Sequence, residues 1–270
     1  MKIASFNIQK FGNRKLSDPM VIQTLIKIVS RYDIVVVLEV VDASKEAVNS
    51  FLTELNKANP QHHYSMQLSV RLGRTKYKEQ FMFLYRDAVV KVTDTYQYEE
   101  KQPGDEDVFD REPYILQFSL TNTVVKDLVL IPVHTKPEDS VKELKKLYDV
   151  VLEMKKKWKT DNIMILGDFN ADGRYMSKKE RKALSIFTDK NFHWLIIDEV
   201  DTTTSTKNDH TYDRIVVYEQ VMLDGIVPNS ARAFNFQREY GLTEADALKV
   251  SDHYSVEVEL KINTDVKPLP

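Results

Sequence analysis

Polar side chains stand at the ends of several apolar runs that are typical of buried β-strands. Their oxygen atoms and imidazoles could bind a cation or transfer a proton. They are Asn7 after residues 2–6, Glu39 after 34–38, His134 after 128–133, Asp168 and Asn170 after 163–166, and Asp252 with His253 before a final run. Because strand ends in an α/β protein open onto a crevice, we expect these side chains to meet in one site.

This set of side chains suits the hydrolysis of a phosphodiester. The reaction needs a deprotonated water, neutralised charge on the phosphoryl oxygens and a protonated leaving oxygen. Carboxylate and amide oxygens suit a hard divalent cation, and an imidazole titrates near neutral pH. The sequence therefore predicts a metal-dependent phosphodiesterase in which His134 and His253 transfer protons. The other histidines are interpreted as structural or solvated: His62, His63, His193 and His210.

Taken singly, each of these residues also has a simpler interpretation. An Asp or Asn after a strand more often caps a turn than binds a metal. Glu39 is harder to explain in that way, because it follows Ile-Val-Val-Val-Leu and a charge leaving a buried strand needs a partner. Gly167 lets the chain turn, so that Asp168 and Asn170 can face the same way. The combination of residues favours the catalytic hypothesis.

Strand-like runs alternate with helical segments along the chain. Apolar residues at helical spacing predict helices near residues 17–29, with Ser17 as the N-cap, and near 44–57 and 138–159. Adjacent strand runs at 80–96 and 115–134 indicate hairpins. Alternation of strands and helices together with hairpins predicts an α/β fold with mixed sheets.

Composition limits the possible classes of protein. The chain has 270 residues, 42% of them hydrophobic, and no linker-like stretch, so we expect one domain over residues 1–262 and a short tail over 263–270. Cysteine is absent, which excludes disulfides, thiolate metal sites and a cysteine nucleophile. No run approaches the ~18 apolar residues of a membrane span, so we expect no membrane partner. The net charge of −3 means that any contact with nucleic acid must come from a local patch.

The order of the motifs along residues 2–260 resembles the deoxyribonuclease I family of the endonuclease/exonuclease/phosphatase fold. The matching motifs are Ser-Phe-Asn7, Leu-Glu39-Val, Tyr77-Lys-Glu79, Arg111-Glu112-Pro113, Pro-Val-His134, Gly-Asp168-Phe-Asn170-Ala-Asp, Tyr212-Asp213-Arg214 and Ser251-Asp252-His253. The resemblance implies a four-layer α/β sandwich of two packed mixed β-sheets flanked by helices. It also implies an endonuclease that hydrolyses double-stranded DNA with weak sequence selectivity, leaves 5′-phosphate ends and uses Mg²⁺ (or Mn²⁺) and Ca²⁺.

The resemblance further implies a role for each site residue. His253, paired with Asp213, would activate the water, and His134, oriented by Glu79, would protonate the leaving O3′. The catalytic cation would be bound by Asn7, Glu39, Asp168 and Asp252, and Asn170 would hold the phosphate. Contacts with DNA would come from Arg74, Tyr77, Arg111, Tyr175 and Tyr212.

Two structural calcium sites are also implied by the resemblance. One would be formed by Glu99, Asp107, the carbonyl of Phe109 and Glu112, and the other by Asp201, Thr203 and Thr206. From the residues alone, the acidic stretch 99–110 equally fits a solvated loop.

The chain departs from the family at several points. Where secreted members carry a disulfide, it has Gly173 and His210. The family implies secretion, whereas the lack of cysteine and of an apolar leader after Met1 argues against it. The pattern near residues 64–69 does not support the actin binding of one member. We expect a monomer.

Two other functions remain open. A phosphoinositide phosphatase or sphingomyelinase would share the strand-end residues, but the motifs around Glu79, Arg111 and Asp213 favour the nuclease. A catalytically silent binding or toxin subunit would keep the fold alone. The presence of Glu39, His134 and His253 argues against that hypothesis.

Overall fold

Two mixed β-sheets form the centre of the computed structural model, which describes residues 1–100, 103 and 107–264. Within the described residues, the first sheet has the order β11-β12-β1-β2-β4-β3, and its strands are β1 (Lys2–Phe11), β2 (Ile34–Val40), β3 (Tyr64–Leu68), β4 (Gln80–Arg86), β11 (Arg232–Phe234) and β12 (Ser255–Glu259). The second has the order β5-β6-β7-β8-β10-β9, with β5 (Val90–Gln97), β6 (Tyr114–Leu120), β7 (Asp127–His134), β8 (Ile163–Asp168), β9 (Phe192–Trp194) and β10 (Asp213–Tyr218).

The two sheets repeat one pattern of strand pairing. Among the described strands, each sheet has a single parallel pair, β1 with β2 in the first sheet and β7 with β8 in the second. Antiparallel strands flank both pairs, with β12 beside β1 and β10 beside β8. The chain therefore contains two similar halves, and the carboxyl ends of both parallel pairs carry the polar residues noted in the sequence.

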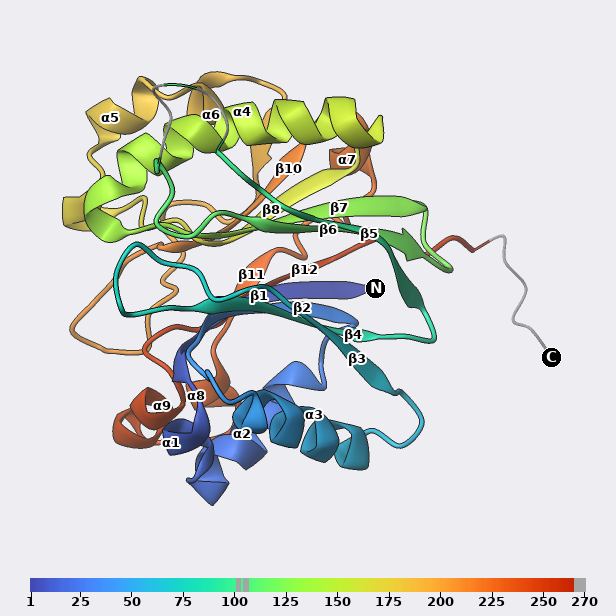
Figure 1. Cartoon of the computed structure of the whole chain (residues 1–270), viewed down its shortest axis with the longest axis vertical. Helices are drawn as coiled ribbons and strands as arrows, with labels where there is room; N and C mark the ends of the chain where they lie inside the picture. Colours follow the sequence, from blue (N-terminus) through green and yellow to red (C-terminus); the bar gives the residue numbers. More distant parts are fainter. Residues whose placement is uncertain (101–102, 104–106, 265–270) are drawn as a thin grey trace.

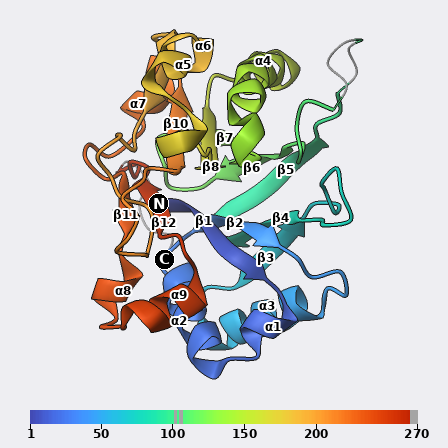
Figure 2. The same cartoon turned by 90° about the vertical axis from the view of Figure 1, so that its left-hand side faces the viewer.

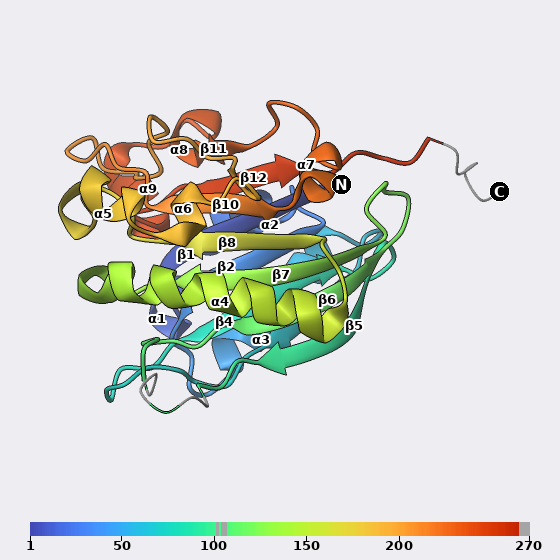
Figure 3. The same cartoon turned by 90° about the horizontal axis from the view of Figure 1, so that it is seen from above.

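Helices cover the outer face of each sheet, which gives four layers (Figure 1). In Figures 1 and 2, α1–α3, α8 and α9 lie beside the first sheet, and α4–α7 lie beside the second. Seen from above, α4 runs along β7 and β8 (Figure 3). The helices are α1 (Asn13–Leu16), α2 (Pro19–Val29), α3 (Glu46–Ala58), α4 (Ser140–Trp158), α5 (Lys178–Lys182), α6 (Ser185–Thr188), α7 (Gln220–Asp224), α8 (Phe236–Glu239), α9 (Glu244–Val250), and the 3-10 turns η1 (Pro137–Asp139) and η2 (Gly173–Tyr175).

Burial on both faces explains the near-continuous apolar runs of the central strands. Leu116, Leu166 and Ile215 pack against the first sheet, whereas Ile163 and Ile165 of β8 pack under α4. Every residue of β8 is buried. Strands enclosed in this way have no solvent-facing side, so they lack the alternation of polar and apolar residues that marks a surface strand. The predicted α/β sandwich is confirmed.

A few local predictions differ from the structure. The N-cap of α2 is Asp18 and not Ser17, because the Asp18 carboxylate accepts hydrogen bonds from Met20 N and Val21 N. The three-residue strands β9 and β11 were not expected, since so short a run carries no periodicity. Residues 265–270 of the predicted tail lie outside the described residues. Among the described residues, no helix has both the length and the apolar composition needed to cross a membrane.

Candidate active site

The carboxyl ends of both parallel pairs converge on one point between the sheets. The register of the second sheet sets His134 of β7 and Asp213 of β10 on either side of Asp168 of β8. Across the gap, Asn7 Nδ2 of β1 donates hydrogen bonds to Asp168 Oδ2 and to Glu39 Oε1, each at 3.1 Å. The buried amide of Asn7 therefore joins the two sheets at the place where the predicted catalytic residues meet.

Unusual backbone geometry directs several of these side chains. Glu39 has φ 60° and Asn170 has φ 46°, both in the left-handed region. Gly167 has φ +146°, and a Cβ there would stand 1.9 Å from the Val133 carbonyl oxygen. Only glycine fits so close an approach, which brings the Asp168 turn directly against β7. The sequence-based argument about Gly167 is supported by this contact.

His253 and Asp213 form a buried pair on one side of Asp168. His253 Nδ1 lies 2.6 Å from Asp213 Oδ2, and His253 Nε2 lies 3.6 Å from Asp168 Oδ2. Burial raises the pKa of Asp213 to about 6. Burial opposes charge on the imidazole, but the Asp213 and Asp168 carboxylates outweigh it and raise the pKa of His253 well above its ordinary value. The free Nε2 thus points to the centre of the site while Nδ1 is held by Asp213.

A second pair, formed by His134 and Glu79, lies on the other side. His134 Nδ1 is 2.8 Å from Glu79 Oε2, and His134 Nε2 is 3.8 Å from Asp168 Oδ2. Burial disfavours protonation of His134, yet the Glu79 charge outweighs it and raises the pKa. Arg111 Nε lies 3.4 Å from Glu79 Oε2 and donates to the His134 carbonyl at 3.2 Å. A protonated imidazole beside an ionised carboxylate suits a general acid.

The predicted cation ligands fit a hard divalent ion. Asn7 Oδ1 and Asp252 Oδ1 are buried oxygen atoms with no hydrogen-bond partner among the described residues. Buried oxygens of this kind are costly unless something binds them. Glu39 and Asp168 bring two further carboxylates, one on each side of Asn7. Asp252 Oδ1 lies 3.8 Å from His253 Nε2, and Asp252 Oδ2 accepts a hydrogen bond from Gln9 Nε2 at 3.2 Å.

Several residues that support the site were not predicted from the sequence. Ser251 Oγ donates to the Asn7 carbonyl at 2.6 Å and accepts from His253 N at 3.0 Å. Thr202 Oγ1 accepts from Asp213 N at 3.2 Å. Ser251 is part of the Ser-Asp-His motif, although no role was predicted for it, and no pattern in the sequence marks Thr202. Lys15 reaches the edge of the site, where burial lowers its pKa to about 8 against the charges of Asp252 and Glu39.

Tyr175 and Tyr212 line a cavity that opens beside His253. The cavity has a volume of about 640 Å³ and includes Asn170, Asp252 and Arg174 in its wall. The two tyrosine rings have centroids 5.7 Å apart, and Tyr212 lies 6.5 Å from the His253 imidazole. Tyr77 is 45% exposed. Burial and the nearby charges of Glu79 and Glu39 raise the Tyr77 pKa. Three of the five predicted DNA contacts therefore border the site.

The two predicted arginine contacts are already engaged within the protein. Arg111 is only 7% exposed and pairs with Asp110 at 2.8 Å, in addition to its contacts with Glu79 and His134. Arg74 Nη1 pairs with Asp139 at 3.1 Å, and its Nη2 donates to the Val108 carbonyl. Arg111 therefore contacts the general-acid pair directly, through Glu79 and the His134 carbonyl, whereas Arg74 contacts the segment 107–110 and Asp139.

The acidic residues predicted to bind calcium gather in two places. Glu100, Asp107 and Glu112 place ligand atoms within 4.8 Å of one another. Glu100, and not the predicted Glu99, completes this group, and its Oε2 accepts from Phe109 N. At the second place, Asp201 Oδ1 accepts from the amide and hydroxyl of Thr203. Asp201, Thr203 and Thr206 line one cavity of about 360 Å³. The Thr206 hydroxyl donates a hydrogen bond to Glu244.

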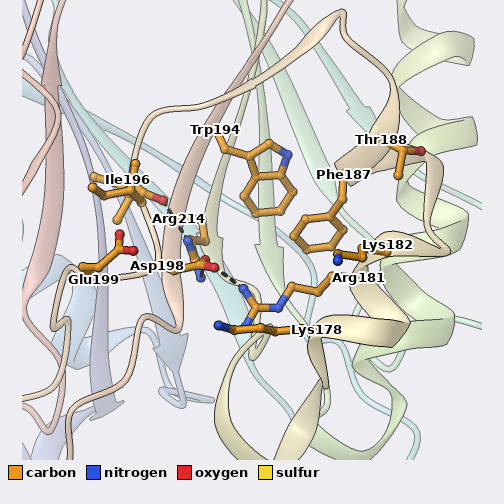
Figure 4. Close-up of a pocket in the computed structure, with 11 residues that line it drawn as sticks. Lys178, Arg181, Lys182, Phe187, Thr188, Trp194, Ile196, Asp198, Glu199 and Arg214 are labelled. Carbon is orange, nitrogen blue, oxygen red and sulfur yellow. Dashed lines mark hydrogen bonds and ion pairs between the residues drawn. The ribbon is translucent and has the colours of Figure 1, made fainter.

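Ion pairs anchor the loop that leads to Asp213. Figure 4 shows Asp198 between the guanidinium groups of Arg181 and Arg214, and it lies 2.8 Å from each. Arg214, which directly follows Asp213, is fully buried and also donates to the Thr211 and Ile196 carbonyls. At Gly173, an added Cβ would lie 2.9 Å from the His210 ring. The positions of the family disulfide are thus in contact, with an imidazole packed on a glycine.

Comparisons with known proteins identify the family of the chain. The model of the Endonuclease/Exonuclease/phosphatase family matches residues 4–253, and the chain belongs to that family. Within it, the chain is a member of the deoxyribonuclease I family. It is 42% identical to human deoxyribonuclease gamma, covering 97% of this chain and 86% of that protein, and 42% identical to rabbit deoxyribonuclease-1, covering 96% and 92%. It is thus a deoxyribonuclease I-like enzyme.

A solved structure supports the fold. An endonuclease/exonuclease/phosphatase family protein from Leptotrichia buccalis superposes with a TM-score of 0.69 at 13% identity, covering 97% of this chain and 100% of that one. At this level of identity the likeness concerns only the fold.

Proposed function

We propose that the chain is a metal-dependent endonuclease that hydrolyses double-stranded DNA with weak sequence selectivity and leaves 5′-phosphate ends. One observation carries the proposal. Two imidazoles, each oriented at Nδ1 by its own carboxylate, direct Nε2 toward Asp168 from opposite sides. This arrangement provides a base and an acid for attack and departure at one phosphorus.

The chemistry follows from the two pairs. His253 Nε2 accepts a proton from the attacking water, while Asp213 stabilises the imidazolium that forms. His134 Nε2 gives a proton to the leaving O3′ as the P–O3′ bond breaks, so the phosphate stays on the 5′ side. Glu79 fixes the tautomer of His134 and keeps its pKa high. Asn170, whose Nδ2 donates to the Thr135 carbonyl at 3.0 Å and lies 3.5 Å from Thr135 Oγ1, would hold the phosphate.

A divalent cation is the expected cofactor of this site. Asn7, Glu39, Asp168 and Asp252 would hold Mg²⁺ (or Mn²⁺), which would neutralise charge on the phosphoryl oxygens. Ca²⁺ would occupy the acidic group at Asp107 and Glu112 and the group at Asp201, where it would support the structure.

DNA is the proposed substrate because the relatives named above are deoxyribonucleases. Tyr175, Tyr212 and the guanidinium of Arg174 line the cavity beside His253, and Tyr77 lies near Glu79 and Glu39. Aromatic and guanidinium groups at a minor groove respond to groove width and phosphate position, which predicts weak selectivity and a preference for duplex over A-form RNA. The net charge of −3 predicts weak binding that falls steeply with salt.

A substrate comparison tests the proposal. Supercoiled plasmid, single-stranded DNA, RNA and phosphoinositides are each incubated with Mg²⁺, with and without EDTA, and the ends are mapped with a phosphatase-dependent ligation assay. We expect duplex DNA to be cut fastest and its products to carry 5′-phosphates. Cleavage should stop when EDTA removes the free cation. Faster turnover of a lipid or of RNA would assign the chain to another branch of the family, and no turnover at all would favour a silent binding protein.

A further inference from the structure

Glu143 is a buried carboxylate that the proposed mechanism does not use. It lies in the first turn of α4 and is 1% exposed. A carboxylate so deeply buried is costly unless hydrogen bonds compensate it. Its Oε1 accepts two backbone hydrogen bonds, from Lys136 N at 3.0 Å and from Asp110 N at 3.4 Å. These two amides belong to segments that are far apart in the sequence.

Both segments lead directly to the general-acid side of the site. Lys136 is two residues after His134, and Asp110 immediately precedes Arg111. Arg111 in turn donates to the His134 carbonyl at 3.2 Å and lies 3.4 Å from Glu79 Oε2. The contacts therefore close a ring that runs from Glu143 through Asp110, Arg111 and His134 to Lys136 and back to Glu143.

The ring constrains the position of Arg111 in two ways. From its own segment, Asp110 Oδ2 accepts from Arg111 Nη1 at 2.8 Å, so the guanidinium follows any movement of Asp110. From the opposite segment, the His134 carbonyl fixes Arg111 Nε. Among the described side chains, only Glu143 accepts hydrogen bonds from the backbone amides of both Asp110 and Lys136. Without it, the two segments are joined through Arg111 and, farther from His134, through Arg74, which pairs with Asp139 and donates to the Val108 carbonyl.

We propose that Glu143 is a positioning residue for the general acid: it fixes the Arg111 segment to the chain after His134, and thereby sets Glu79 and the His134 imidazole in line with the leaving oxygen. The inference rests on the proposed function, in which His134 protonates the leaving O3′. Loss of the Oε1 acceptor frees both segments and displaces the imidazole, and a displacement near 1 Å reduces the rate about 100-fold.

A leaving group that needs no proton separates this role from a merely structural one. In a duplex with one 3′-bridging phosphorothiolate, water attacks the phosphorus and the P–S bond breaks. The electron pair departs on sulfur as a thiolate, which is stable without protonation because thiols have a pKa of about 8.5. His253 still accepts the proton of the water. A defect confined to the general acid is therefore relieved on this linkage, whereas a defect of the base is not.

The experiment measures single-turnover cleavage at that one position, with P–O or P–S linkage, for the wild type, E143A, E143Q, H134A and H253A. The matched control is E153A, which removes an exposed carboxylate from the same helix. We expect E143A to lose about 10- to 100-fold on the P–O linkage and little on the P–S linkage, as H134A does. E143Q keeps an acceptor oxygen and should remain near the wild type, as should E153A.

Each other outcome has a defined meaning. Equal losses of E143A on both linkages, with H134A relieved on the P–S linkage, would overturn the positioning role alone. Failure of the P–S linkage to relieve H134A would overturn the assignment of His134 as acid, and this inference with it. If circular dichroism shows E143A unfolded, E143D replaces it, because its shorter side chain cannot reach both amides. E143D must then show the same linkage-dependent loss.

Discussion

His134 and His253 approach the same oxygen atom, Asp168 Oδ2, through their Nε2 atoms at 3.8 and 3.6 Å. Each imidazole is held at Nδ1 by a different carboxylate, so neither can rotate without breaking a buried contact. The two proton-transfer groups are thereby kept on opposite sides of one small volume. A phosphate bound there would meet a base on one face and an acid on the other.

Replacement of either histidine should nearly abolish catalysis without unfolding the chain. General acid and base catalysis each contribute about 10²–10⁴-fold, so H134A and H253A should each reduce plasmid nicking by that amount. H62A, which changes an exposed loop histidine, is the control. Activity above about a tenth of the wild-type rate in either variant, estimated from the same range, would show that its role is misassigned.

The D213N substitution should move the acid limb of the pH–rate profile to lower pH. The base must be neutral to accept a proton, and the Asp213 charge raises the pKa of His253, so the neutral form is lost early as the pH falls. Without that charge the pKa of His253 falls, and activity persists at lower pH. The maximal rate should still fall, because the imidazole loses its orienting carboxylate.

The control for this shift is D87N, which removes the carboxylate of the exposed His63–Asp87 pair. Its pH–rate profile should match that of the wild type. If the acid limb of the D213N pH–rate profile coincides with that of the wild type, a group other than His253 governs the rate in this pH range.

The stability of the chain should depend on pH through Glu143. Burial raises the Glu143 pKa from 4.5 to about 7. The unfolded chain therefore loses this proton first as the pH rises, and the folded state is destabilised between pH 4.5 and about 7, by about 3 kcal/mol in all. E143Q does not titrate. Its melting temperature relative to the wild type should rise from pH 5 to pH 8, whereas that of E153Q should not.

Calcium should protect the chain against heat through the group at Glu100, Asp107 and Glu112. Burial, together with mutual repulsion, raises the pKa of Glu100 and Glu112, and a bound cation would relieve both effects. A ligand at 100 times its Kd stabilises the native state by about 2.7 kcal/mol. Melts of the wild type in Ca²⁺ and in EDTA should differ, and the difference should shrink in E112Q. Wild-type melting curves that superimpose in Ca²⁺ and in EDTA would contradict the proposal of a calcium site at these residues.

Much of the site could be predicted because strand ends are visible in the sequence. Asn7, Glu39, His134 and Asp168 each follow a long apolar run, and strands of parallel pairs bring their carboxyl ends together. The contacts that orient these residues could not be predicted in the same way. Thr202 reaches Asp213 N through a loop whose path depends on tertiary packing.

The same limit explains the differences at charged residues. The resemblance to the family predicts a DNA contact for Arg111, but the sequence does not show that two carboxylates and a carbonyl hold this side chain inside. Glu99 and Glu100 are adjacent, and only the backbone conformation decides which one turns toward Asp107. Ser17 and Asp18 are both good N-caps, and the choice between them depends on where the preceding turn ends.

The loop before Asp213 is held by Asp198, Arg181 and the packing of His210 on Gly173, and the chain contains no sulfhydryl group at all. The enzyme should therefore be indifferent to thiol–disulfide exchange with its medium. Dithiothreitol, glutathione and alkylating agents such as iodoacetamide have no cysteine to act on, so refolding involves no mispaired intermediates and no oxidant. The same loop should instead be sensitive to ionic strength, because salt screens the ion pairs that the exposed Asp198 forms with Arg181 and Arg214.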